Sequence, residues 1–164
     1  MTSVITPNIQ KLLLLRNNAC IMLKQRGYCL DNAEFGDNYI RIPEVFVIFV
    51  PGGKLKISRL KNILSLRIAD EKIIIIHENT ITSEARNVIT STQNIETFTY
   101  YEMGFDFCSV VPPHTKVEKH NHKDWKLYPK LAQSEIACTY FGFEKDDIIK
   151  VVEDDNTISY RRVV

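Results

Sequence analysis

The chain has 164 residues, of which 45% are hydrophobic, and a net charge of +1 at neutral pH. This length allows one or two small domains with modest cores, and the balanced charge excludes a strongly basic polyanion-binding protein. No apolar run is long enough for a membrane span, and Leu12–Leu15 is too short for a signal peptide because Arg16 closes it. The four cysteines lack Cys-x-x-Cys spacing, which predicts free thiols in a reducing compartment.

The first segment of the chain predicts a helix. Thr6-Pro7 places a capping residue before a proline at the first helical position, and Gly27 follows Arg26 where a helix end is expected. The apolar face of this helix is predicted to consist of Ile9, Leu12, Leu13, Ala19, Cys20 and Leu23.

Apolar runs typical of buried strands then alternate with amphipathic helices. The run Val45–Val50, between Pro43 and Pro51, is continuous and apolar, as expected of a strand buried on both faces. Further strands are expected at 73–76 and 95–100, and helices at 57–66 and 83–89. This alternation with short connections predicts a small parallel sheet with right-handed crossovers.

The last third of the chain predicts one helix and a β-hairpin. Ser134 is the expected N-cap of the helix, and Gly142 stands where a left-handed C-terminal residue is needed. The hairpin strands are expected at 147–152 and 157–164, joined by the polar turn 153–156, so the final residues are predicted to be structural. Such a unit is too small to bury a core alone, which implies a second domain or a partner.

Five short motifs in this last third occur in an order that is known from one family. They are Val110-Val111-Pro112-Pro113-His114, Tyr128-Pro129-Lys130-Leu131, Thr139-Tyr140-Phe141-Gly142, Ile148-Ile149-Lys150-Val151 and Tyr160-Arg161-Arg162-Val163-Val164. In sequence and spacing this block resembles the C-terminal assembly domain of the fifth shared subunit of eukaryotic nuclear RNA polymerases, a family that also has archaeal members. The block departs from the family pattern in several places. Cys108 replaces a histidine, Thr139 an arginine and Asp146 a turn glycine, and the hairpin is shorter.

The resemblance extends more faintly to the first part of the chain. Arg26-Gly27-Tyr28 and Thr82-Ser83-Glu84-Ala85 match short pieces of the family's N-terminal jaw domain. The resemblance therefore implies an α/β protein with a shortened, parallel-sheet jaw domain at 1–105 and an assembly domain with a terminal hairpin at 106–164.

The resemblance also implies a function. The resemblance implies that the protein is a non-catalytic subunit of a multisubunit DNA-directed RNA polymerase and has no cofactor or metal. The subunit would be anchored to the largest subunit at the lower jaw, near downstream DNA. In a cell the subunit would be nuclear and shared by polymerases I, II and III. A viral polymerase subunit, located in a cytoplasmic factory or in the virion, is the alternative. Contacts with the largest subunit are expected from Pro112, His114, Pro129, Tyr140, Phe141, Gly142, Tyr160, Arg161, Val163 and Val164.

A run of basic residues in the N-terminal half has two readings. Lys54, Lys56, Arg59 and Lys61, followed by Arg67, occur with no acid among them. They are typical of the solvated face of an amphipathic helix. Alternatively they form a weak patch for DNA phosphates, whose binding would be independent of sequence and sensitive to salt.

Two other clusters invite a metal-site hypothesis. His120-Asn121-His122 with Asp124 has imidazole and carboxylate ligands, but it lies in a polar stretch that favours a solvated surface. Asp70-Glu71-Lys72, with Glu44 as a further ligand, resembles a nuclease signature and supports the alternative of a magnesium-dependent nucleic-acid-processing enzyme. Because the acids precede the strand, chance turn chemistry is the favoured interpretation. An interaction adaptor that uses the assembly fold elsewhere is a third reading.

Overall fold

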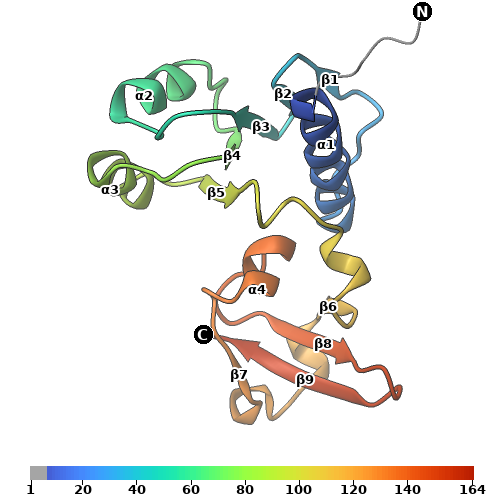
Figure 1. The fold of residues 1–164 in the computed structure, drawn as a ribbon. Helices are drawn as coiled ribbons and strands as arrows, with labels where there is room; N and C mark the ends of the chain where they lie inside the picture. The colour runs from blue at the N-terminus through green and yellow to red at the C-terminus, as the bar shows by residue number, and fades with distance from the viewer. Residues whose placement is uncertain (1–6) are drawn as a thin grey trace, which may run out of the picture. The chain divides into compact units, whose positions relative to one another are not determined.

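The computed structural model describes residues 7–164 (Figure 1). The chain divides into two compact units, the first ending at Phe105 and the second beginning at Asp106. The described residues form four α-helices and two mixed sheets, which confirms the predicted α/β class.

Helix α1 spans Pro7–Gln25, with the proline at the first helical position as predicted. Thr6, the predicted cap, lies outside the described residues. The predicted apolar face is only partly correct, because Ile9 and Leu13 are about half exposed. The consecutive leucines of this helix occupy every side of it, so periodicity alone could not select the buried stripe. That stripe is formed by Leu15, Ala19, Met22 and Leu23.

A five-stranded sheet in the order β1-β2-β3-β4-β5 forms the centre of the first unit. Its strands are β1 (Glu34–Phe35), β2 (Tyr39–Ile42), β3 (Val45–Val50), β4 (Lys72–His77) and β5 (Ile95–Thr99). Strands β3, β4 and β5 are parallel and are joined by α2 (Ile57–Ser65) and α3 (Ser83–Ser91), as predicted. Strands β1 and β2 are antiparallel and were not predicted, so the sheet is mixed and not purely parallel. They are short and partly exposed, and therefore leave no clear apolar period.

The core of the first unit lies on both faces of β3 and β4. On one face, Phe46, Ile48, Ile73 and Ile75 pack against α2 and α3. Their neighbours in each strand point to the opposite face, which α1 covers (Figure 1). Burying each of these isoleucines stabilises the folded state by about 1.5–3 kcal/mol. Because both faces of β3 and β4 are buried, both strands have continuous apolar sequences.

The second unit contains a four-stranded sheet in the order β6-β8-β9-β7. Its strands are β6 (His114–Val117), β7 (Lys130–Leu131), β8 (Ile148–Val152) and β9 (Ile158–Val163), and its α-helix is α4 (Ile136–Phe141). Three short 3-10 helices are η1 (Phe107–Ser109), η2 (Lys119–Asn121) and η3 (Trp125–Leu127). The predicted hairpin is β8 and β9, which pair antiparallel, while β6 and β7 are additional edge strands.

Residues at the ends of α4 and β8 define the local geometry of the second unit. Gly142 adopts the left-handed conformation (φ 70°) that was predicted for the end of α4. The predicted cap Ser134 is wrong by one residue: the N-cap is Glu135, whose carboxylate accepts from the backbone of Ala132 (3.1 Å). Asp146, which stands at the family's turn glycine, has φ 70° and so keeps the glycine-like backbone.

The interior of the second unit is small but complete. Leu131, Cys138, Ile149, Val151 and Val163 form its buried cluster, so β7, β8 and β9 pack together with α4. Within the described residues, no helix is long and apolar enough to cross a bilayer.

Candidate functional site

The five family-like motifs are brought together in the second unit. His114 starts β6, Leu131 lies in β7, and Tyr140 and Phe141 end α4. The remaining two motifs form β8 and β9, which pair along their length. Segments that are far apart in the sequence therefore share one sheet and one helix.

An aromatic stack lies at the end of α4. The ring of Phe141 stacks on Phe143 (5.4 Å between centroids) and on His114 (5.7 Å). Phe107 packs against Tyr140 at 4.6 Å. Because the carbonyl of Pro112 can only accept, the 2.6 Å contact with His114 requires a proton on its Nδ1. This hydrogen bond orients the imidazole ring so that it stacks on Phe141.

The residues predicted to contact the largest subunit fall into two groups. Tyr140 and Val163 are buried inside the unit, so their side chains stabilise the fold. The rest are at least partly accessible: Pro112, His114, Pro129, Phe141, Gly142, Tyr160, Arg161 and Val164. A contact surface on this unit therefore has to be built from the second group.

Two cysteines lie in the same unit and have no disulfide partner. Burial raises the pKa of Cys138 to about 11, with the nearby charges of Glu135 and Asp147 acting in the same direction. Burial also raises the pKa of Cys108, whose thiol lies 3.9 Å from the hydroxyl of Tyr140. Both are therefore protonated at neutral pH and are poor nucleophiles.

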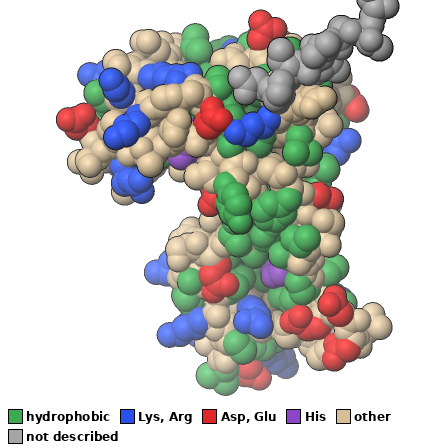
Figure 2. Space-filling model, in the orientation of Figure 1, with side chains coloured by type: hydrophobic (Ala, Val, Ile, Leu, Met, Phe, Trp, Pro, Cys, Tyr) green, Lys and Arg blue, Asp and Glu red, His purple; other side chains and the backbone are tan. Residues whose placement is uncertain are grey.

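The predicted basic patch begins before α2, with Lys54 and Lys56, and continues into the helix with Arg59 and Lys61. Lys54, Lys56 and Lys61 are exposed, whereas Arg59 is half-buried and donates to the carbonyl of Pro51 (3.1 Å). Figure 2 shows Lys and Arg side chains gathered over α2 and α3. The buried residues of α2 are Leu60 and Ile63, so the helix is amphipathic as predicted. Both readings of the patch are compatible with this geometry.

Two residues of the nuclease-like triplet, Glu71 and Lys72, make structural contacts, while Asp70 is exposed. Glu71 is buried, pairs with Arg41 (3.2 Å) and accepts from the backbone of Ile68 (3.0 Å). Lys72 pairs with Glu96 at 2.8 Å. In the part of the chain that the structure describes, no group of three or more metal-ligating side chains is present. The arrangement favours a structural role for Glu71 and Lys72.

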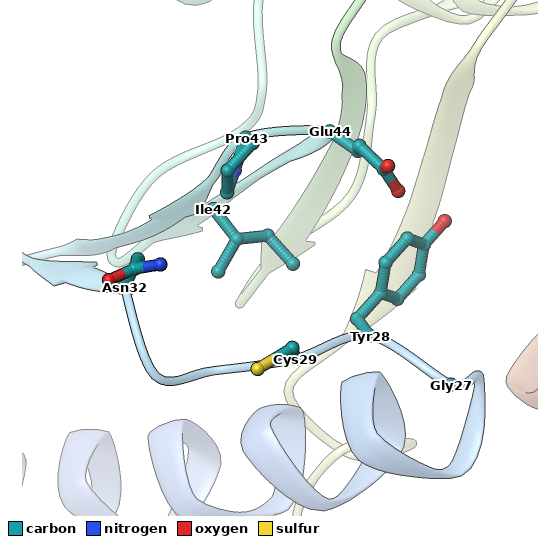
Figure 3. Close-up of a pocket in the computed structure, with 7 residues that line it drawn as sticks. All are labelled: Gly27, Tyr28, Cys29, Asn32, Ile42, Pro43 and Glu44. Atoms are coloured by element: carbon teal, nitrogen blue, oxygen red, sulfur yellow. The ribbon is translucent and has the colours of Figure 1, made fainter.

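A cavity of about 290 Å³ lies between the segment after α1 and the β2–β3 turn (Figure 3). Its polar groups are the phenol of Tyr28, the carboxylate of Glu44, the amide of Asn32 and the thiol of Cys29. The ring of Tyr28 points towards Glu44 in Figure 3. The described residues that line the cavity include the carboxylate of Glu44 and no Lys or Arg side chain.

The sequence analysis missed a group of residues around Trp125. His122, which was weighed as a metal ligand, contacts the Tyr128 hydroxyl through Nδ1 (2.8 Å) and packs on Tyr160 (4.5 Å between centroids). Trp125 has three basic groups over its ring, from Lys119, Lys126 and Arg162. The recurrence of lysine around the single tryptophan was the available signal, but the contribution of β9 was visible only in three dimensions.

Comparison with known proteins finds a viral protein that is similar to part of the chain. No family model matches the chain. The chain is 25% identical over 87 residues to a protein named uncharacterized protein 028R, from Frog virus 3. The match covers 50% of this chain and 54% of that protein, so the chain spans about half the length of the curated relative it matches.

Proposed function

We propose that this protein is a non-catalytic subunit of a multisubunit DNA-directed RNA polymerase. The observation that carries the proposal is the convergence of the five family-like motifs in the second unit, where they build one sheet and one helix. Three of the motifs supply buried core residues, namely Leu131, Ile149, Val151 and Val163, so they have the structural part that the resemblance implies for them. In this proposal the second unit anchors the protein to the largest subunit at the lower jaw.

The aromatic stack supplies a suitable anchoring surface. Phe141 and Phe143 are half-buried, and Val110, which precedes Pro112, is 65% exposed. Partly exposed aromatic rings on a firm support are typical centres of protein interfaces, because they bury a large area at a low entropic cost. The ordered ring of His114 adds a polar contact at the edge of this surface.

The first unit is proposed to project towards downstream DNA. The exposed lysines at the start of α2 would then meet phosphates and not base edges, since they offer no paired donors and acceptors. Each lysine–phosphate contact would add little to the affinity for DNA.

The match to a Frog virus 3 protein favours the viral form of this proposal. The protein would then serve a viral polymerase in a cytoplasmic factory or virion. A cellular subunit, nuclear and shared by polymerases I, II and III, remains the alternative form of the proposal.

Affinity purification of the tagged protein from cells that make it tests the proposal. We expect the largest polymerase subunit among the co-purified proteins, with its amount reduced at least tenfold by Phe141→Ala. The matched control is Phe35→Ala, because Phe35 is 51% exposed and lies in the first unit. Trp125 fluorescence verifies that the second unit of each variant remains folded. Absence of the largest subunit from the wild-type sample would refute the proposal.

A further inference from the structure

One face of the C-terminal sheet carries a mixed aromatic and basic surface. Successive residues of a strand point to opposite faces, so Tyr160 and Arg162 lie on the face opposite the buried Val163. The segment that contains η2 and η3 lies against this face, since Trp125 reaches Arg162 and Tyr128 reaches Tyr160. We call this the tryptophan surface, formed by Lys119, Trp125, Lys126, Tyr128, Tyr160 and Arg162.

Three cations surround the single indole ring of this surface. The Nζ atoms of Lys119 and Lys126 lie 5.1 and 5.7 Å from the centroid of Trp125, and Cζ of Arg162 lies 5.8 Å from it. Each contact is a favourable cation–π interaction. The cations repel one another, however, because they share one ring. A nearby anion would reduce this repulsion.

Within the described residues, no carboxylate lies within ion-pairing distance of these three cations. None of the five ion pairs observed there involves Lys119, Lys126 or Arg162. An incoming anionic group would therefore relieve the repulsion among the three cations.

The aromatic part of the surface narrows the class of ligand. Tyr128 and Tyr160 are stacked at 5.7 Å with 23° between their planes, and the imidazole of His122 packs against both. Between Trp125 and Tyr128, Leu127 is 83% exposed. Supported rings beside unpaired cations combine base stacking with phosphate neutralisation, which is how proteins hold single strands. An acidic peptide would use the cations but would leave the rings without a stacking partner.

We propose that the tryptophan surface binds single-stranded nucleic acid. In the bound state the flexible side chains of Lys119 and Lys126 leave the ring of Trp125 and, with Arg162, contact successive phosphates. The ring face that they vacate stacks on an unpaired base. This binding activity goes beyond the polymerase assignment and does not rest on it, because the whole argument is contained in the second unit.

Intrinsic fluorescence tests the proposal directly, since Trp125 is the sole tryptophan of the chain. The full-length protein is titrated with oligothymidine and oligouridine of about 12 nucleotides, a length within the range that one small fold covers. We expect quenching that saturates. The logarithm of the binding constant should fall with the logarithm of salt concentration with a slope of about −2, as three phosphate contacts to a single strand require.

Variants with matched charge locate the site. Lys119→Gln/Lys126→Gln should weaken binding at low salt at least tenfold, and adding Arg162→Gln should weaken it further. The control is Lys24→Gln/Lys145→Gln, which removes the same charge from exposed positions outside the surface and should bind as the wild type does. The double variant retains every residue of the sheet, so it remains informative if the triple variant folds poorly.

Four results would overturn the proposal. They are wild-type affinity in the double variant, equal quenching by polyglutamate of the same length, equal quenching by an abasic oligonucleotide, and equal or tighter binding of a duplex. Polyglutamate would identify an acidic peptide as the ligand. Equal quenching by the abasic strand would show that base stacking does not contribute to binding. Equal or tighter binding of a duplex would show that the surface does not require unpaired bases.

Discussion

Ionisable side chains at the edge of the first unit's core are held in ion pairs. Glu96 accepts from Arg26 (2.7 Å) and from Lys72 (2.8 Å), and the side chain of Arg26 is only 4% exposed. Burial alone would raise the pKa of Glu96, but the charges and hydrogen bonds of Arg26 and Lys72 outweigh it and hold the pKa below its usual range. These two ion pairs therefore connect the residue that follows α1 with strands β4 and β5.

Glu96→Gln should destabilise the first unit at neutral pH. Removing one partner of a largely buried ion pair costs about 3 kcal/mol. Because the folded pKa of Glu96 is lowered, its contribution is present above the unfolded pKa and is lost as pH falls through the folded pKa. The wild type should thus lose more stability than the variant on acidification below about pH 4, the usual range of a glutamate.

Urea unfolding followed by circular dichroism at neutral and acidic pH measures this effect. Glu84→Gln is the control, because Glu84 is exposed on α3 and has no role in this ion pair. A Glu96→Gln protein as stable as the control at neutral pH would contradict the structural role assigned to the pair.

At the scale of elements, β9 is the central support of the second unit. It pairs with β8 on one side and β7 on the other, and it contributes the buried Val163. The backbone N–H of Val164 donates to the carbonyl of Leu131 (3.0 Å), and its carbonyl accepts from the N–H of Gln133 (3.0 Å). The terminal motif is therefore part of the sheet and its core.

Deleting residues 160–164 should unfold the second unit. The deletion separates β7 from β8 and removes a core valine, a combined loss of several kcal/mol. Deleting Val164 alone is the milder control, since it leaves Val163 in place. Limited proteolysis and Trp125 fluorescence report the fold, and co-purification reports assembly. If the shorter protein enters the polymerase at normal occupancy, the anchoring role proposed for this unit is wrong.

At the scale of the whole molecule, the two units differ in the chemistry of their exposed surfaces. The first presents exposed lysines at α2, and the second presents the aromatic stack and the tryptophan surface. The near-zero net charge conceals this separation, because acidic residues elsewhere cancel the local basic groups.

The exposed lysines before and within α2 should affect complexes with duplex DNA in a manner that depends on salt. Lys54→Gln/Lys56→Gln/Lys61→Gln should shorten the lifetime of elongation complexes at low salt and have little effect at high salt. Three phosphate contacts to duplex DNA correspond to a change of about 3 in the slope of log affinity against log salt. Lys24→Gln/Lys123→Gln/Lys145→Gln is the charge-matched control, with all three lysines exposed. Equal lifetimes for the two variants at low salt would show that the patch is only a solvated helix face.

The sequence by itself determined the elements with strong apolar patterns. Strands β3, β4, β5, β8 and β9, the helices and the conformation of Gly142 follow from burial and backbone preferences that act locally. The short strands β1, β2, β6 and β7 were not predicted, because pairing with a neighbour and not a local pattern makes them strands. The site divides in the same way. The lysines of α2 could be read from the chain, whereas only the tertiary structure decided which motif residues are buried and that Arg162 of β9 meets Trp125. Such contacts join residues distant in sequence, and their geometry depends on how the sheet brings them together.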